Sequence, residues 1–231
     1  MVMQYYPLFL DVRGKKCVVV GGGGVGARKA GTLARAGGVV TVVSLHFSRR
    51  LNTLAETLPI TLTQKSYDPS DLTSAFIVIA ATDSRTLNRR VREDARRDNI
   101  LCNIIDQPET SDFLVPAVVN QGDLSIAVST TGKSPALAKH LRKELAKTFG
   151  PEYARFLVLM GNLRQALLHE DHNPEGHKTI FRELIHRGVI ELIRDGGHDQ
   201  IDSILYEVTG KAYRVEDLMA GFSDKTNTDH T

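Results

Sequence analysis

Short apolar runs alternate with helical patterns over the first half of the chain. The runs are rich in β-branched residues and are mostly continuous, which is typical of parallel strands covered on both faces. Strands are predicted at 17–20, 39–44, 60–64, 75–81 and 100–105, and helices at 25–36, 47–58 and 85–98. This alternation predicts an α/β fold built on a parallel sheet. The apolar and aromatic residues 4–10 are expected to cover an edge of that sheet.

The pattern changes after residue 112. Two short β-rich runs, 113–119 and 124–129, flank the segment 120–123, and this arrangement predicts a hairpin outside the parallel sheet. Ser134 as N-cap and Pro135 at the first helical position predict the start of a helix. The helices predicted after the hairpin are 135–149, 153–169, 177–195, 200–208 and 215–220.

These patterns divide the chain into four segments. The α/β domain is expected at 1–112, followed at 113–150 by a β-rich extension of a kind that often serves dimerisation through exchange between subunits. Gly150-Pro151 marks the start of a small all-helical domain at 151–222. The polar tail 223–231 is expected to be flexible.

A glycine-rich turn follows the first predicted strand and opens the first predicted helix. It contains Gly21-x-Gly23-x-x-Gly26, the spacing of dinucleotide-binding Rossmann domains. There the first glycine makes the tight turn, the second lets the backbone approach a pyrophosphate, and the third lets helix and strand pack closely. A glycine turn can also exist only to let a helix pack on a sheet. Because strand, turn and helix occur in the required order, nucleotide binding is the preferred interpretation.

The end of the second predicted strand departs from the usual NAD-binding pattern. An Asp or Glu commonly stands there to bind the ribose hydroxyls, whereas this chain has Ser44-Leu45-His46. Arg49 and Arg50 follow closely, and their positive charge leaves binding of the 2′-phosphate of NADP as an alternative. NAD remains the preferred cofactor.

Two further polar segments follow predicted strands at the edge where parallel sheets bind ligands. Thr82-Asp83-Ser84 follows the run 75–81, and its side chains are candidates both for ligand contact and for capping the next helix. Asp106 follows the run 100–105 directly before Gln107-Pro108. A carboxylate there is placed to accept a proton or to orient substrate nitrogens, although Asp is also common as a turn cap before proline.

Composition narrows the classes of function. The formal net charge is only +2, which gives no bulk attraction to nucleic acid or membrane. The two cysteines, Cys17 and Cys102, offer neither a disulfide framework nor a metal-ligand spacing, and both are expected to be core residues of a cytoplasmic protein. No window is long and apolar enough for a membrane span. The histidines around residues 169–177 are expected to lie in a hydrophilic connection, and no metal site is predicted.

Two predicted helices are strongly basic. The arginines of 85–98 are interpreted as a solvated face. In the helix after Ser134, the lysines and arginines are equally compatible with a solvated face and with a site for carboxylates. Gly132-Lys133-Ser134 resembles the end of a phosphate-binding P-loop, but the earlier glycine of that motif is replaced by Ala127, so an ATP site is rejected.

Several separated motifs together resemble a known family. They are Gly-Gly-Gly-Gly-Val-Gly-Ala-Arg-Lys-Ala at 21–30, Ala-Ala-Thr-Asp at 80–83, Asn-Ile-Ile-Asp at 103–106, Phe-Leu-Val-Pro at 113–116 and Ala-Val-Ser-Thr-Thr-Gly-Lys-Ser-Pro at 127–135. In this order they resemble precorrin-2 dehydrogenase, the sirohaem synthase family whose bifunctional members also insert ferrous iron into sirohydrochlorin. The likeness runs from about Tyr5 to Phe149, and beyond Pro151 only the helical character matches.

The resemblance implies a Rossmann domain, a dimerisation segment and a helical domain in a homodimer. It implies that Gly24-Val25 and Leu45-His46 touch NAD largely through backbone, and that Asp106 is the essential carboxylate. The residues implied for cofactor binding are Gly21, Gly23, Gly24, Val25, Gly26, Ser44, Leu45, His46 and Thr82, and those for the polycarboxylate substrate are Ser129, Lys133 and Ser134. Thr130 matches the position of a serine that is phosphorylated in one fused member.

The implied activity is NAD-dependent oxidation of precorrin-2 to sirohydrochlorin. Three alternatives stay open: a bifunctional enzyme that also inserts ferrous iron, a dehydrogenase that leaves chelation to another protein, and a regulatory module that senses NAD without consuming it. The absence of an acid after the second strand and the segment 113–135 argue against the sensing module.

Overall fold

The computed structural model describes residues 5–105, 107–170 and 174–220. The chain forms two compact units, Met1–Val115 and Pro116–Thr231, and each is described by itself. The division predicted at residue 150 stays a prediction. No helix in the described ranges is long and apolar enough to cross a bilayer.

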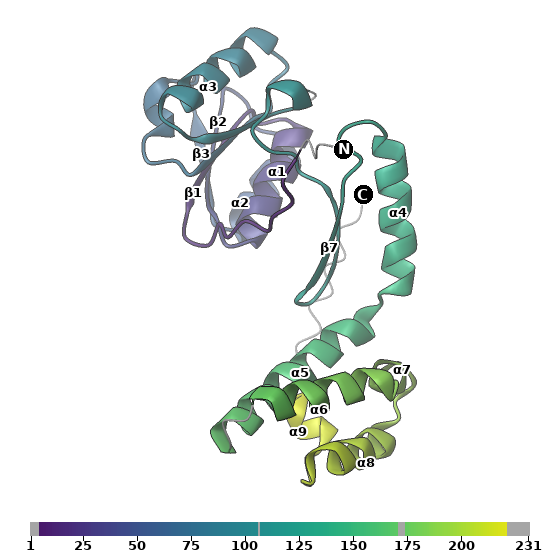
Figure 1. The fold of residues 1–231 in the computed structure, drawn as a ribbon. Coiled ribbons are helices and arrows are strands. Elements are labelled where there is room, and N and C mark those ends of the chain that lie inside the picture. Colours follow the sequence, from purple (N-terminus) through teal and green to yellow (C-terminus); the bar gives the residue numbers. More distant parts are fainter. Residues whose placement is uncertain (1–4, 106, 171–173, 221–231) are drawn as a thin grey trace. The chain divides into compact units, whose positions relative to one another are not determined.

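The first unit is a parallel sheet with helices on both faces (Figure 1). Its strands are β1 (Lys16–Val20), β2 (Val39–Ser44), β3 (Ile60–Gln64), β4 (Ile77–Ala80) and β5 (Leu101–Ile104), in the order β3-β2-β1-β4-β5. Its helices are α1 (Gly24–Arg35), α2 (Arg49–Thr57) and α3 (Arg85–Arg97), with short 3-10 turns η1 (Pro69–Leu72) and η2 (Pro108–Thr110). The order reverses at β1, so the carboxyl ends of β1 and β4 border the crevice where such sheets bind ligands.

Alternate residues of the central strands enter two separate cores. In β1, Cys17 and Val19 face the core shared with α1 and α2, whereas Val18 and Val20 face the core shared with Val91 of α3. This two-sided burial explains why the strands read as continuous apolar runs. Cys17 and Cys102 are free thiols buried in these cores, as predicted.

Capping residues set the helix boundaries close to the predicted ones. The Ser48 and Ser84 hydroxyls accept hydrogen bonds from backbone amides in the first turns of α2 and α3. Gly37, just past the end of α1, has a left-handed backbone conformation with φ of 85°, which is typical of a residue that ends a helix. The strand predicted at 75–81 is shorter at both ends in the structure.

The prediction for the amino-terminal segment is wrong. Tyr6 and Phe9 are 82% and 75% exposed, and Leu8 and Leu10 are exposed as well. Their apolar character does not reflect burial against the sheet within this unit.

The second unit begins with an antiparallel hairpin of β6 (Ala117–Gln121) and β7 (Leu124–Val128), in which Val119 pairs with Ile126. Gly122 in the turn has φ of 57°, the left-handed conformation that a two-residue hairpin turn requires. Residues 113–116, predicted as strand, precede β6 and are not part of it. Helix α4 (Pro135–Thr148) packs against the hairpin.

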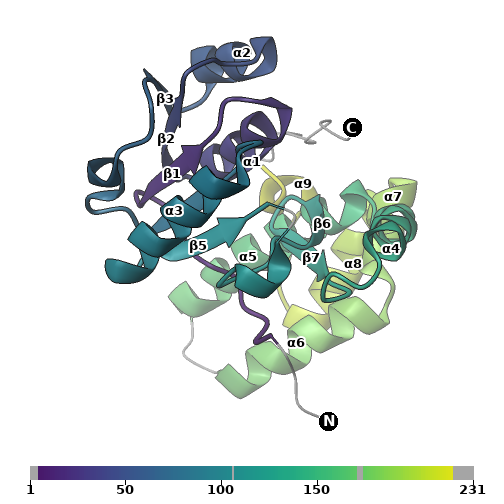
Figure 2. The same cartoon turned by 90° about the horizontal axis from the view of Figure 1, so that it is seen from above.

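The described residues of the second unit contain five further helices, which can be followed in Figures 1 and 2. They are α5 (Pro151–Glu170), α6 (Pro174–His186), α7 (Val189–Asp195), α8 (His198–Thr209) and α9 (Val215–Leu218). The single helix predicted at 177–195 is wrong, because Gly188 adopts φ of 71° and separates α6 from α7. The buried carboxylate of Glu152 on α5 accepts hydrogen bonds from Arg194 on α7 and ties these two helices together.

Candidate functional site

The glycine turn after β1 is closed on one side and open on the other. Gly21 has φ of 123°, and a methyl group there would lie 2.3 Å from the carbonyl oxygen of Ala81. A methyl group on Gly26 would lie 2.0 Å from the carbonyl oxygen of Gly21. Beside Gly23 and Gly24, by contrast, no described heavy atom beyond their chain neighbours would lie within 4 Å of such a methyl group. The first and third glycines of the motif serve close packing, and the second leaves backbone accessible.

The amino terminus of α1 is free to bind an anion. Its N-cap is Gly23, which has no side chain to accept a hydrogen bond from the first turn. The first turn of a helix leaves backbone amides without intrahelical partners, and here these belong to Gly24, Val25 and Gly26. Together with the positive end of the helix dipole, these amides favour a phosphate group.

The loop after β2 lies directly against the glycine turn. The amide of Ser48 donates a 2.8 Å hydrogen bond to the carbonyl oxygen of Gly22, and a methyl group on Gly22 would lie 2.1 Å from the carbonyl oxygen of His46. Ser44 is half-buried, whereas the side chains of Leu45 and His46 are exposed. Gln64 on β3 donates to the carbonyl oxygen of Leu45 and holds this loop from the other side.

A third segment, after β4, is held by a buried amide. Asn88 on α3 is 4% exposed; its side-chain oxygen accepts hydrogen bonds from the backbone amide and hydroxyl of Thr82, at 3.2 and 2.6 Å, and its side-chain nitrogen donates to the Thr82 carbonyl. The Ser84 hydroxyl caps α3. Because Gly21 approaches Ala81 and the Thr82 amide, this segment adjoins the glycine turn.

The structure therefore brings the residues predicted to hold the cofactor to one edge of the sheet. Three strands that are neighbours in the sheet, β2, β1 and β4, end at this edge, and the segments that follow them contact one another at the glycine turn. These segments contain Ser44–His46, Gly21–Gly26 and Thr82. Asp106, the predicted catalytic carboxylate, lies outside the described residues. Its chain neighbours are described: Ile105 follows the carboxyl end of β5, and Gln107 precedes η2.

The residues predicted to bind substrate lie in the second unit, in the turn between β7 and α4. The Ser134 hydroxyl accepts a hydrogen bond from the Leu137 amide and is the predicted N-cap of α4. The Thr130 hydroxyl donates to the carbonyl oxygen of Ser134 and accepts from its amide, which closes the turn. The side chains of Ser129 and Lys133 are exposed.

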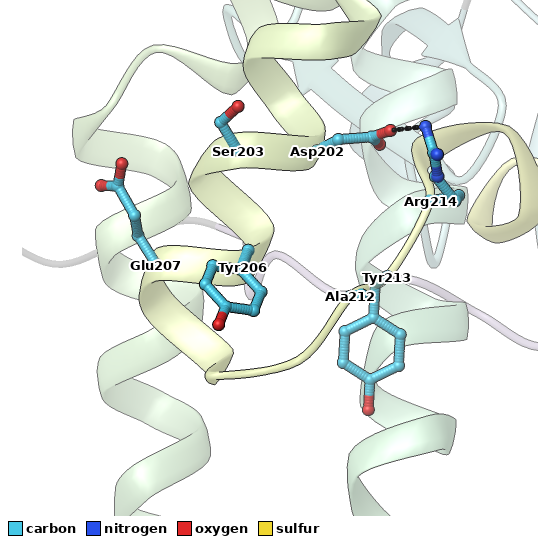
Figure 3. A pocket seen from close by; sticks show the side chains of 7 residues that line it. All are labelled: Asp202, Ser203, Tyr206, Glu207, Ala212, Tyr213 and Arg214. Carbon is cyan, nitrogen blue, oxygen red and sulfur yellow. Dashed lines mark hydrogen bonds and ion pairs between the residues drawn. The ribbon is translucent and has the colours of Figure 1, made fainter.

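A shallow hollow in the second unit was not predicted. It has a volume of about 370 Å³ and is lined by Asp202, Ser203, Tyr206, Glu207, Ala212, Tyr213 and Arg214 (Figure 3). The carboxylate of Asp202 pairs with Arg214 and accepts a 2.7 Å hydrogen bond from the Val215 amide at the start of α9. Asp202 therefore fixes the connection between α8 and α9, and we assign the hollow no chemistry.

Comparison with known proteins follows the same division of the chain. Residues 8–117 match a family model described as NAD(P)-binding, and residues 121–148 match the model of the central region of sirohaem biosynthesis proteins. The "Siroheme synthase" of Ruthia magnifica is 31% identical over 92% of this chain and 47% of its own length, and that of Methylococcus capsulatus is 32% identical over 93% and 45%. Over these residues the chain is similar to sirohaem synthases.

The chain spans less than half the length of these sirohaem synthase relatives. A solved structure titled "SirC, precorrin-2 dehydrogenase" matches with a TM-score of 0.74 over 90% of this chain and 100% of the other, at 22% identity, and this similarity shows a shared fold.

The glycine turn of this chain fits a dinucleotide. Its middle residues leave room for a pyrophosphate, the helix behind them starts without a capping side chain, and the loop after β2 reaches the same place. The described residues at the end of β2 include no carboxylate, as the sequence showed. The groups of this loop that can form hydrogen bonds to a ribose include its backbone groups and the side chains of Ser44 and His46.

Sequence reasoning missed three features of the first unit. The Asn88 amide is hidden in a basic helix pattern, and only its place four residues after the Ser84 cap signals it. Lys29 on α1 is half-buried beside Arg28; burial first and the neighbouring guanidinium second lower the pKa of its ammonium group to about 8. Arg92, assigned to a solvated face, instead pairs with Asp112.

Proposed function

We propose that this protein is an NAD-dependent precorrin-2 dehydrogenase, which oxidises precorrin-2 to sirohydrochlorin in sirohaem synthesis. The observation that carries the proposal is the glycine turn with an open middle and an uncapped helix, in a chain similar to sirohaem synthases. The same early steps also serve cobalamin or haem synthesis in organisms that branch from this product, so the pathway served is part of the test.

The amides of Gly24–Gly26 would hold the pyrophosphate of NAD. The backbone of Leu45 and His46, with the Ser44 hydroxyl, would face the adenosine ribose, and Thr82 would border the nicotinamide end of the crevice. When bound, NAD⁺ accepts a hydride. The Asn88 side chain fixes Thr82 before any ligand arrives and so reduces the entropy lost on binding.

Asp106 is proposed as the catalytic base. Removing a hydride from the reduced macrocycle leaves a cation, and a proton must leave for the conjugation to extend, so the balance is precorrin-2 plus NAD⁺ to sirohydrochlorin, NADH and H⁺. A carboxylate following the carboxyl end of β5 has the chemistry to accept that proton and release it to water.

Ser129, Lys133 and Ser134 are proposed to bind the carboxylates of the tetrapyrrole. The ammonium group of Lys133 is exposed, and the turn that carries it is rigid because the Thr130 hydroxyl binds both backbone groups of Ser134. The basic residues along α4 extend this positive surface, and they outnumber Glu144, which pairs with Lys147.

Ferrous iron insertion is the second candidate, favoured by relatives that carry the name "Siroheme synthase". Metallation displaces two pyrrole N–H protons, and Asp106 would accept them in turn. If this activity is absent, the protein is a dehydrogenase that leaves chelation to another protein.

We further propose a cytoplasmic homodimer. Leu137 and Leu141 lie one turn apart on α4 and are 47% and 39% exposed, a pair that a second copy of the chain would cover. Equilibrium sedimentation at micromolar concentration should give twice the chain mass, and Leu141→Asp should shift it toward the monomer. A wild-type monomer would reject the dimer. The free buried cysteines fit a reducing compartment, which cell fractionation would test.

The decisive experiment is anaerobic turnover. Mixing protein, precorrin-2 and NAD⁺ should produce reduced nicotinamide absorbance together with the sirohydrochlorin spectrum, and Asp106→Asn should remove most of the rate. NADP⁺ in place of NAD⁺ should be the poorer substrate. A protein that binds NAD⁺ but produces no reduced nicotinamide is a sensing module, and the proposal fails. Ferrous ion added to sirohydrochlorin tests chelation, with the protein-free rate as the threshold.

A further inference from the structure

The strand β5 is at the edge of the sheet, and side chains from a returning segment cap its free side. The Cys102 amide donates a 2.9 Å hydrogen bond to the Asp112 carboxylate, and the Ile104 amide donates a 2.9 Å hydrogen bond to the Ser111 hydroxyl. These are alternate amides of one strand, so residues 111 and 112 take the place of a neighbouring strand.

Further bonds fix the returning segment in register. The Asp112 amide donates to the Cys102 carbonyl at 2.8 Å, and the Asn103 side chain donates to the Phe113 carbonyl at 2.9 Å. Arg92 on α3 forms an ion pair with the Asp112 carboxylate. Burial opposes ionisation of Asp112, but the hydrogen bonds from Arg92 and the Cys102 amide hold its pKa below the ordinary value.

The Ser111 hydroxyl spans the chain on both sides of residue 106. Its oxygen accepts a hydrogen bond from the Ile104 amide. The hydroxyl lies within donating distance of two carbonyl oxygens, that of Gln107 at 2.9 Å and that of Ile104 at 3.3 Å. The Ile105 amide is bound to Ala80 of β4 at 3.1 Å. One hydroxyl therefore links the end of β5 to the residue immediately after Asp106.

We propose that Ser111, supported by the Arg92–Asp112 ion pair, is a positioning residue that fixes the described backbone on both sides of residue 106, on which the action of a base at that position depends. The inference rests on the proposed function, because it gives the loop a task only if Asp106 is the base. Misplacing a catalytic group by about 1 Å can cost roughly 100-fold in rate. A single hydroxyl across the loop is therefore worth a measurable part of kcat.

Edge protection alone would also explain these bonds, because an uncapped edge strand exposes amides to other chains. That role predicts lost stability with no selective effect on chemistry. The chain offers a matched control in Thr110: its hydroxyl lies in the same loop, and among the described residues it hydrogen-bonds to Gln107 alone, at 3.3 Å to the carbonyl oxygen and 3.5 Å to the side-chain oxygen. It does not bind β5.

The test compares Ser111→Ala, Ser111→Thr and Thr110→Ala in the full-length protein. Steady-state turnover of precorrin-2 gives kcat and the KM for NAD⁺, and calorimetric titration with NAD⁺ gives affinity and stoichiometry. Ser111→Ala should lower kcat by roughly 10- to 100-fold, with the KM for NAD⁺ and the NAD⁺ stoichiometry unchanged. Ser111→Thr should restore most of the rate because it keeps the hydroxyl, and Thr110→Ala should behave as wild type.

The role of Ser111 is overturned if Ser111→Ala keeps the wild-type kcat, if Thr110→Ala loses as much, or if kcat and NAD⁺ stoichiometry fall in parallel. If Ser111→Ala does not fold, Asp112→Asn is tested in its place, because it keeps the shape of the side chain and weakens the ion pair with Arg92. A kcat equal to that of the wild type would then reject the positioning role of Ser111 and the ion pair. Failure of the wild-type protein to turn over precorrin-2 is a separate result, which rejects the proposed function itself.

Discussion

The glycine turn allows packing and ligand approach to be separated by two substitutions of the same size. Gly23→Ala adds a methyl group where no described atom beyond the chain neighbours lies within 4 Å, on backbone whose φ of −73° suits any residue. Gly26→Ala adds the same group 2.0 Å from the carbonyl oxygen of Gly21 and 3.7 Å from the Val19 side chain. If the turn exists for a dinucleotide, only the first change should spare the fold while harming binding.

The two substitutions are expected to change the stability of the protein by different amounts. For Gly23→Ala, the weaker N-cap costs about 0.5–1 kcal/mol, and the stiffer unfolded chain returns about 0.4–1 kcal/mol, so stability changes little. For Gly26→Ala, the contact of 2.0 Å must open by more than 1 Å to reach an ordinary separation, and the atom that the new methyl group meets is a backbone carbonyl oxygen. Overpacking of this kind costs about 1–3 kcal/mol or more, which lowers the melting temperature by several degrees.

Binding should show the reverse order. A methyl group on Gly23 stands where the pyrophosphate would approach the amides of α1, so the Kd for NAD⁺ should rise at least about 10-fold, or ~1.4 kcal/mol. Differential scanning calorimetry measures the stability of each variant, and isothermal titration measures NAD⁺ binding on the same samples. Wild type and Gly23→Ala should melt within about 2 °C of each other.

Two outcomes would refute this reasoning. If Gly23→Ala binds NAD⁺ as wild type does, the open side of the turn is not where the phosphates lie. If Gly23→Ala destabilises the protein as much as Gly26→Ala, the whole motif serves packing, which is the alternative that the sequence left open.

Three further predictions concern charged groups. The pKa of Asp112 is lower in the folded state than its unfolded value near 3.8. The ionised carboxylate therefore stabilises the fold above that unfolded value, and this stabilisation is lost as pH falls through the folded pKa. The urea-unfolding midpoint of the wild type should fall below about pH 4, and Asp112→Asn should make this fall smaller. Folding lowers the pKa of the Lys29 ammonium group from 10.5 to about 8. Between pH 8 and 10.5 the folded protein has already lost this proton while the unfolded chain still holds it, so stability rises with pH. Lys29→Met should therefore melt at a higher temperature than wild type at pH 7, and the difference should shrink toward pH 10. Glu152→Gln removes the charge from a buried partner of Arg194 and should cost about 1–3 kcal/mol in urea unfolding, and an unchanged midpoint would show that this bond adds nothing to the packing of α5 on α7.

The parallel sheet was predictable because each central strand is buried on both faces. Val18 and Val20 meet one core while Val19 meets the other, so the run leaves no polar gap, and Ser84, Ser134 and Gly37 mark helix ends by local backbone chemistry. These signals are written in neighbouring residues. The break at Gly188 was missed because the apolar pattern continues across it, and one left-handed residue redirects the chain without interrupting that pattern.

The supports of the site were harder to predict than its lining. The glycine motif specifies its own geometry, whereas the contacts of Asn88 with Thr82 and of Ser111 with Ile104 join side chains to backbone across loops. Such contacts depend on where a loop returns, which no periodicity encodes. Apolar content misled in the amino-terminal segment, where Tyr6 and Phe9 are exposed.

The loop after β2 lies very close to the glycine turn, and its residues 44–46 include no acid. At Gly22 even one methyl group would meet the carbonyl oxygen of His46 at 2.1 Å, and the Ser48 amide is bound to the Gly22 carbonyl. The backbone of this loop lies against the glycine turn, and the side chains of Leu45 and His46 are exposed. This close contact requires glycine at position 22 and places backbone of the loop after β2, rather than a charged side chain, beside the glycine turn.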